Sequence, residues 1–244
     1  MRHTLLVFAF IVGCGQTDPL VERLDTSPIV ASVTVHGGGE KTIVHIADWH
    51  HVSVEDLRKE LPDDATEEEF AEAYAEFLMT VAEVHIEQQS LMTSIGVKRV
   101  WLEGLTDERA DGYRGLCEAM RAVRDNPSEL AEMMESDLVE MGVAALMIVD
   151  GEELEVMPAE DAELWEAGYP FRDGFTNADL ECREDEIVRR IVAAGKSPAY
   201  LICGGSHDFA DNVPSGWCVV RVEVNPWQVA TEHIMAAGPS GNSK

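Results

Sequence analysis

The strongest constraint on the fold is an alternation of short, apolar, β-branched runs with longer segments whose apolar residues recur at helical spacing. Strands are predicted at residues 29–35, 42–46, 97–102, 154–157, 199–203 and 217–224. Helices are predicted at residues 66–95, 126–149, 160–167 and 184–194. Strands that alternate with helices in this way are typical of a mostly parallel sheet with helices on both faces. The sequence therefore predicts an α/β fold.

A glycine-rich connection joins the first two predicted strands. The letters HGGGEK at residues 36–41 stand between them, and glycine readily adopts the positive φ that tight turns need. We therefore expect a β-hairpin, which would place an antiparallel strand pair at one edge of the otherwise parallel sheet.

Capping residues mark the ends of the two longest helices. Thr66 and Glu69 have the spacing of a capping box, and Gly96 follows the last apolar position of the same helix. Asn126 and Pro127 predict the start of the next long helix, because asparagine caps a helix and proline fits its first turn.

Composition and charge exclude several classes of protein. Of the 244 residues, 45% are hydrophobic and 26% are charged, which argues against wholesale disorder, a collagen-like repeat or a coiled-coil rod. The 18 Lys and Arg against 46 Asp and Glu give a net charge of −28. No basic cluster offsets this acidity, so we expect no nucleic acid partner, because phosphate binding needs a basic surface. The sequence leaves the oligomeric state open.

The N-terminus resembles the signal of a bacterial lipoprotein. A short basic start precedes an apolar run at residues 4–12, and the letters IVGC end at Cys14 as in a lipobox. Such a run spans about 13.5 Å as a helix, too short for a hydrocarbon core of about 30 Å. We expect cleavage before Cys14, acylation of Cys14 and anchoring to a membrane. An ordinary secretory signal with an incidental cysteine is the alternative.

This interpretation divides the chain into a signal peptide at residues 1–13, a polar tether at 14–28, a single α/β domain at 29–232 and a flexible tail at 233–244. It predicts a lipid-anchored protein of the cell envelope, on the periplasmic side of the inner or outer membrane or at the cell surface. Export also permits disulfides. The cysteines after Cys14 form no C-x-x-C pair and predict no particular bridge: Cys117, Cys182, Cys203 and Cys218. Within its apolar run, Cys203 is expected to be a buried, inert thiol.

Polar side chains gather at the carboxyl ends of four predicted strands. In an open α/β sheet this edge is where ligands bind. The positions are Asp48 to His51, Glu103, Glu160 with Asp161, and residues 204–208, which read GGSHD. Two of the four ends carry a histidine and the others carry acids, a combination that favours one shared cleft over four solvated loops.

Four segments resemble the TraB/Tiki proteins and their relatives, which include erythromycin esterases of the EreA type and the ChaN iron-regulated lipoproteins. The segments are TIVHIADWHH, HIEQQSLMTSIGVKRVWLEGL, CREDEIVRRIV and LICGGSHDFAD. The family has two G-x-x-H motifs that each end a strand, a Glu after an intervening strand and an Arg that opens a late helix. Here GGSH ends at His207, and ADWH ends at His50 with Ala47 in place of the glycine; Glu103 and Arg183 fit the other positions.

The resemblance implies a similar α/β fold and the hydrolysis of a peptide or ester bond. Relatives of the Tiki branch imply metal-dependent proteolysis, and those of the EreA branch imply metal-free esterase chemistry. The ChaN branch implies an alternative, a lipoprotein that binds haem or iron without catalysis. A degenerate member that serves as an interaction protein is a third possibility, because the methyl group of Ala47 would narrow the cleft.

The residue types at this edge suit definite chemistry. Two imidazoles and a carboxylate fit a divalent transition metal such as Mn, Co or Zn with an open position for water, so His50, Glu103 and His207 are the candidate ligands. Without metal, His50 would deprotonate a water oriented by Asp48 or Glu103. His207 or Arg183 would then stabilise the developing oxyanion. A peptide or a small ester is the expected substrate.

Gly204, Gly205 and Glu160 are the candidate substrate-binding residues, because a double glycine exposes backbone and Glu160 ends a strand at the same edge. Structural roles compete with these assignments. Glu160 could be stabilised by the positive end of the helix that follows it, and Arg183 could form an ordinary ion pair. His85, on the long helix, is expected to be packed or half-exposed.

Overall fold

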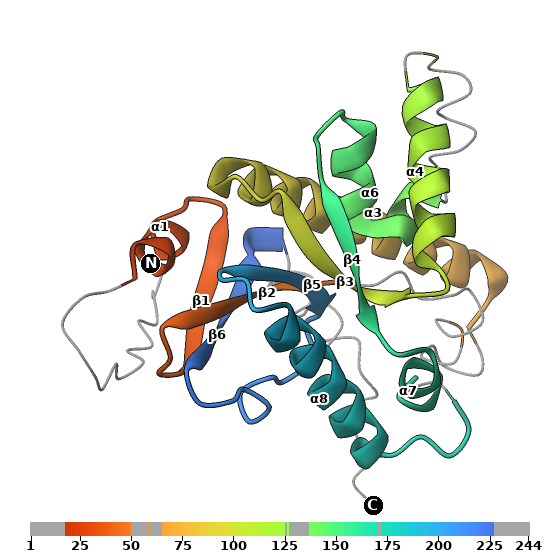
Figure 1. The fold of residues 1–244 in the computed structure, drawn as a ribbon. Helices are drawn as coiled ribbons and strands as arrows, with labels where there is room; N and C mark the ends of the chain where they lie inside the picture. Colours follow the sequence, from red (N-terminus) through yellow and green to blue (C-terminus); the bar gives the residue numbers. More distant parts are fainter. Residues whose placement is uncertain are drawn as a thin grey trace, which may run out of the picture.

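A computed structural model describes residues 18–49, 58, 65–124, 126, 137–169 and 172–226. Its centre is a six-stranded sheet in the order β1-β6-β2-β5-β3-β4 (Figure 1). The strands are β1 (Val30–Gly37), β2 (Lys41–Asp48), β3 (Arg99–Thr106), β4 (Glu155–Glu160), β5 (Ala199–Gly204) and β6 (Trp217–Val224). The β1–β6 pair is antiparallel and the other pairs are parallel. The predicted α/β fold with a mostly parallel sheet is confirmed.

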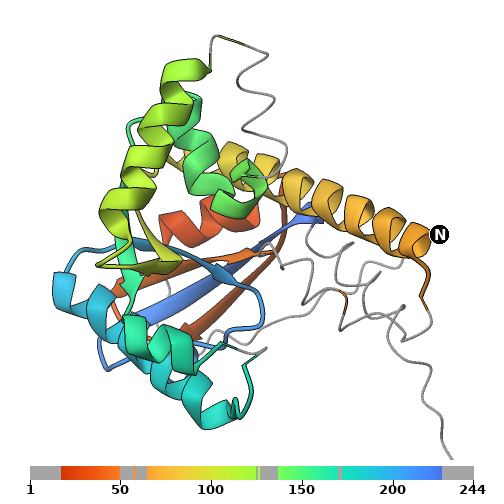
Figure 2. The same cartoon turned by 90° about the vertical axis from the view of Figure 1, so that its right-hand side faces the viewer.

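Helices cover both faces of the sheet, as Figure 2 shows. They are α1 (Pro19–Asp25), α3 (Glu67–Ile95), α4 (Ala110–Val123), α6 (Asp137–Val149), α7 (Ala162–Ala167) and α8 (Asn177–Ala194). The protein has a hydrophobic core on each face of the sheet. Alternate side chains of β2 belong to one core or the other, because successive strand side chains point to opposite faces. Val44 and Ile46 pack on the side of α3 and α6, whereas Ile43 packs with Ile187 of α8.

The predicted hairpin between the first two strands is wrong. β6 lies between β1 and β2, antiparallel to the first and parallel to the second. The connection passes against the start of β6, where the Lys41 N–H donates to the Gly216 carbonyl at 3.1 Å. A Cβ on Gly39 would lie 2.0 Å from the backbone carbon of Gly216. The glycines therefore permit close backbone contact with a third strand, which local turn chemistry cannot reveal.

Helix boundaries agree with the sequence in one case and differ in others. α3 begins after the capping box of Thr66 and Glu69 and ends at Gly96, whose φ is 75°, as predicted. α8 begins at Asn177 because Thr176 and Asp179 form a second capping box, so it starts before the predicted residue 184. α4 was not predicted. Of the predicted helix at 126–149, the structure describes Asn126 and α6, in which Gly142 has non-helical angles.

The predicted tether contains structure. Asp18 caps α1 by accepting the Leu20 N–H, and Pro19 fits the first turn. Leu24 is fully buried in the core on the α3 side. The predicted signal peptide, Cys14 and the predicted tail from residue 233 lie outside the described residues. In the described part of the chain, no helix is long and apolar enough to cross a membrane.

Candidate functional site

The carboxyl ends of β3, β4 and β5 bring three of the predicted site positions together on the α8 side of the sheet. Glu103 lies within β3, Glu160 is the last residue of β4, and Gly204 is the last residue of β5. α8 runs across this edge and contributes Arg183 and Glu184, both buried. The edge where open α/β sheets bind ligands is thus lined by charged side chains that are largely removed from water.

His207 lies in the loop that follows β5, and two carboxylates hold its ring. Nδ1 is 2.8 Å from Glu184 Oε1, and Nε2 is 3.0 Å from Glu103 Oε1. The same oxygen of Glu184 accepts the backbone N–H of Asp208 at 3.2 Å. The Phe209 ring stacks beside the imidazole with the ring centroids 5.7 Å apart. Both ring nitrogens are therefore engaged, and the orientation of the imidazole is fixed.

Arg183 bridges two of the acids. Its Nη2 donates to Glu103 Oε1 at 2.5 Å and to Glu160 Oε1 at 2.6 Å, and its Nε donates to Glu160 at 3.1 Å. All three side chains are at most 7% exposed. Arg183 thus forms the ion pair that was the structural alternative to its predicted catalytic role, and the guanidinium offsets the cost of burying the two carboxylates.

Glu103 is the centre of this network. Its Oε1 contacts Arg183 and His207, while its Oε2 accepts the backbone N–H of Gly204 at 2.5 Å. The carboxylate therefore joins β3, β5, α8 and the loop after β5. A carboxylate in this position fixes these elements relative to one another and can also offer an oxygen to a cation.

Glu103, Cys203 and His207 form a possible metal-binding triad. One ligand atom from each of these residues lies within 4.8 Å of the others. Cys203 faces the α8 side, because it lies two residues after Leu201 along β5 and both side chains belong to the core on that side. The predicted ligands Glu103 and His207 are thus brought together, and the Cys203 thiol, which was not predicted as a ligand, lies beside them.

Burial and charge alter the protonation of this cluster. Burial disfavours the protonated His207 ring, but the neighbouring Cys203 and Glu103 outweigh burial, so the pKa of His207 is raised. Burial raises the pKa of the Cys203 thiol, and Glu103 acts in the same direction. Burial also raises the pKa of Glu160, against the opposing effect of Arg183. The folded protein therefore favours a protonated His207 ring and a neutral Cys203 thiol.

Asp48 belongs to the same edge of the sheet but to its other face. Its carboxylate is buried, and its Oδ1 lies 3.2 Å from Nε2 of His85 on α3. Gln88, also on α3, donates to the Ala47 carbonyl at 2.9 Å. The side chain of Asp48 is therefore directed toward α3, away from the Glu103–His207 network.

His50, the other predicted catalytic histidine and metal ligand, lies outside the described residues. The strand that precedes it, β2, lies beside β5, the strand that precedes His207. Asp48 pairs with Gly204 in the β2–β5 register, and the Asp48 carbonyl accepts the Gly205 N–H at 3.0 Å. The two motif-bearing strands thus end side by side, as the sequence analysis assumed.

The predicted substrate-binding residues are already engaged within the protein. The Gly204 N–H binds Glu103, and the Gly205 carbonyl accepts Nη2 of Arg221 at 2.6 Å. Arg221 also donates to the His207 carbonyl at 3.1 Å, so its guanidinium holds the loop at two points. Glu160 is bound to Arg183. These contacts hold the three residues in place around His207.

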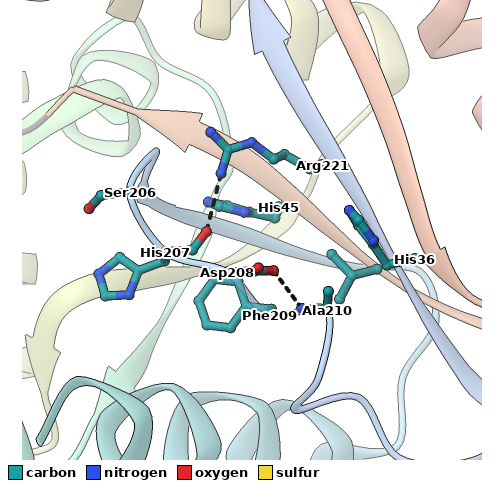
Figure 3. Close-up of a pocket in the computed structure, with 9 residues that line it drawn as sticks. His36, His45, Ser206, His207, Asp208, Phe209, Ala210 and Arg221 are labelled. Carbon is teal, nitrogen blue, oxygen red and sulfur yellow. Dashed lines mark hydrogen bonds between the residues drawn. The ribbon is translucent and has the colours of Figure 1, made fainter. Parts of the chain in front are cut away.

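A pocket of about 220 Å³ lies beside the His207 loop. Figure 3 shows it between the loop and strands β1 and β6, with His36 and Arg221 on one side and Phe209 on the other. The His207 ring lies beyond Phe209, directed away from His36. His45 is buried at its base, where its Nε2 is 3.0 Å from the Cys203 carbonyl, and burial lowers its pKa to about 4.

Sequence reasoning missed two members of the cluster. Glu184 shares a helix stripe with Ile187 and Ile191, at spacings of three and seven residues, so this apolar face indicated its burial. Cys203 was interpreted as an inert thiol because it ends an apolar run. Its place directly before the GGSH motif was the available signal, because the last residues of this strand lie next to the site.

Comparison with models of known protein families, with curated proteins and with solved structures gave no match.

Proposed function

We propose that this protein is a metal-dependent hydrolase that cleaves a peptide or small ester bond. The observation that carries the proposal is the cluster of Glu103, Cys203 and His207, whose ligand atoms lie within 4.8 Å of one another at the carboxyl edge of the sheet. A catalytic metal site keeps a coordination position open for water or substrate, whereas a structural site is closed by four protein ligands.

The chemistry of the donor set fits a divalent transition metal. His207 is held by Glu184 through Nδ1 at 2.8 Å, which directs Nε2 toward Glu103. A carboxylate behind a metal-binding imidazole is the usual outer partner of such ligands, because it fixes the tautomer and the ring orientation. When bound, the metal would polarise the scissile carbonyl and lower the pKa of a bound water.

Arg183 and Glu160 support the site from behind. The guanidinium balances the charge of Glu103 and fixes its oxygens, while Glu160 fixes the guanidinium through both Nε and Nη2. A prearranged polar environment of this kind needs little rearrangement during a reaction. His50 is the residue that we propose as general base, because it follows β2 at the edge where Asp48 pairs with Gly204.

Metal content and turnover together test this function. We would purify the protein without chelators, determine its metals by elemental analysis and assay chromogenic esters and quenched fluorescent peptides. We expect one transition metal per chain, and we expect His207→Ala and Glu103→Gln to lose both metal and turnover. His36→Gln, which removes an imidazole beside the pocket, is the matched control and should retain both. Turnover that survives His207→Ala or complete removal of metal would contradict the proposal.

We further propose that the protein is anchored in the cell envelope through Cys14. The support is the basic start, the apolar run at residues 4–12 and the IVGC letters. Metabolic labelling with a fatty acid should mark the wild-type chain and should fail for Cys14→Ser. A labelled Cys14→Ser chain, or an unlabelled wild type, would contradict the anchor and leave the hydrolase proposal untouched.

A further inference from the structure

The sulfur of Cys203 distinguishes this cluster from an ordinary site of histidines and carboxylates. The side chain is fully buried, and it shares the α8 face of β5 with Leu201. Its ligand atom lies within 4.8 Å of those of Glu103 and His207. A buried thiol that packed only as an apolar group would need neither a carboxylate nor an imidazole at this distance.

The position of Cys203 is fixed by its backbone as well as by its strand. It pairs with Ala47 of β2, and its carbonyl lies 3.0 Å from Nε2 of His45. The next residue, Gly204, donates its N–H to Glu103 at 2.5 Å. The thiol and the carboxylate are thus held by adjoining groups of one rigid strand end, which is the precision that a metal site requires.

A thiolate changes which metal such a site prefers. Carboxylate and water ligands suit manganese and magnesium, whereas a soft thiolate favours zinc and the later transition metals. A cluster of one carboxylate, one imidazole and one thiolate therefore discriminates among the metals that the sequence suggests. Magnesium and manganese gain little from sulfur, while zinc and cobalt gain a strong bond.

We infer that Cys203 is a metal ligand that makes the site selective for zinc or cobalt over manganese. The inference rests on the proposed function, because it requires a metal at Glu103 and His207. In the binding step a metal–sulfur bond forms as the S–H bond breaks and a metal–nitrogen bond forms as the Nε2–H bond of His207 breaks; both protons pass to solvent, and neither the metal nor the ligands are oxidised or reduced. Cys203 is thereby a binding residue rather than a passive part of the core.

Cobalt substitution tests the inference by a readout other than activity. Co²⁺ bound to a thiolate gives an intense near-ultraviolet charge-transfer band that nitrogen and oxygen ligands do not give. We expect the wild-type chain to show this band on addition of one equivalent of Co²⁺. Zn²⁺ should abolish it by displacement, and an equal concentration of Mn²⁺ should not. Cys203→Ser should lose the band. It should also weaken zinc binding by more than about tenfold, because removal of a residue that only supports a ligand already costs about tenfold or more, and Cys203 is proposed as a ligand itself.

Cys218→Ser is the matched control, because Cys218 is also buried in a strand but contacts Thr42 instead. It should keep the band. Cobalt that binds to the wild type without the charge-transfer band would overturn the role of Cys203 and leave a metal at Glu103 and His207 intact. Failure of the wild type to bind Co²⁺ or Zn²⁺ at all would overturn the proposed function as well. Cys182→Ser removes the exposed free cysteine and should also keep the band. A wild type that binds Co²⁺ without the band decides against Cys203 even if Cys203→Ser does not fold.

Discussion

Glu184 Oε1 lies 2.8 Å from Nδ1 of His207 and also accepts the backbone N–H of Asp208 at 3.2 Å. One buried carboxylate oxygen therefore sets both the tautomer of the imidazole and the path of the loop that carries it. This pair decides whether His207 presents Nε2 to Glu103, and it makes Glu184 a positioning residue for the proposed metal site.

Replacement of Glu184 should weaken metal binding more than it weakens the fold. Glu184→Gln keeps an oxygen that can accept hydrogen bonds but removes the charge, so we expect a loss of about 10–100-fold in zinc affinity. Competition with a chromogenic chelator measures this affinity. Asp185→Asn is the control, because Asp185 is the exposed acid next to it on α8 and binds Asn212. Equal affinities for Glu184→Gln and the wild type would refute the positioning role.

Removal of Arg183 should destabilise the protein strongly. Arg183→Met leaves Glu103 and Glu160 buried without a cation between them, and breaking a buried ion pair in this way costs about 3–5 kcal/mol. Urea unfolding measures the free energy. The double variant with Glu160→Gln should recover part of the loss because one unpaired charge is removed. A single-variant loss below about 1 kcal/mol would mean that water reaches the site and screens the acids.

The position of β6 between β1 and β2 predicts contrasting effects for two adjacent glycines. A Cβ on Gly39 would lie 2.0 Å from the Gly216 backbone, whereas a Cβ on Gly38 would meet nothing within 4 Å. Gly39→Ala should therefore lower the unfolding free energy by about 1–3 kcal/mol, the usual cost of forced overpacking. Gly38→Ala should change it little. Thermal melting of both variants measures the difference. Equal melting midpoints for Gly38→Ala and Gly39→Ala would contradict the close contact between Gly39 and Gly216.

His45 should make the fold sensitive to acid. Its pKa is lowered from 6.5 to about 4 by burial, so the unfolded chain takes up a proton at a pH where the folded protein does not. The stabilising effect is present above pH 6.5 and is lost as the pH falls toward 4. The loss amounts to about 3 kcal/mol, because each unit of pKa difference corresponds to about 1.36 kcal/mol.

The measurement is the difference in unfolding free energy between the wild type and His45→Gln across this pH range. The glutamine amide can still donate to the Cys203 carbonyl but does not titrate there. As the pH falls, the unfolding free energy of the wild type should therefore decrease more than that of His45→Gln. Parallel curves from pH 7 to pH 4 would show that His45 is not held neutral.

Local patterns predicted the elements whose signals are local. The capping box of Thr66 and Glu69 and the stop at Gly96 set both ends of α3, and the apolar runs located β5 and β6. The hairpin prediction failed because Gly39 contacts Gly216, a residue far along the chain that no local turn rule includes. β6 pairs with both β1 and β2, so this distant strand occupies the place that the hairpin would have given to direct pairing of the two.

The candidate site was predictable to the extent that it lies at strand ends. Glu103 and His207 were found because acids and histidines after apolar runs mark the carboxyl edge of a sheet. Glu184 and Cys203 belong to apolar patterns that indicate burial, and their chemistry became clear from their three-dimensional neighbours. Asp48 was assigned to the same cleft, but the alternation of β2 turns its side chain toward His85.

Anomalous diffraction from crystals that contain one equivalent of zinc tests the central claim most directly. The proposal predicts a single strong zinc peak about 2.0–2.3 Å from the His207 Nε2, the Cys203 sulfur and a Glu103 oxygen, the normal range of zinc–ligand distances. A zinc peak bound elsewhere, or no peak among these three atoms while they keep the hydrogen bonds described above, would contradict it.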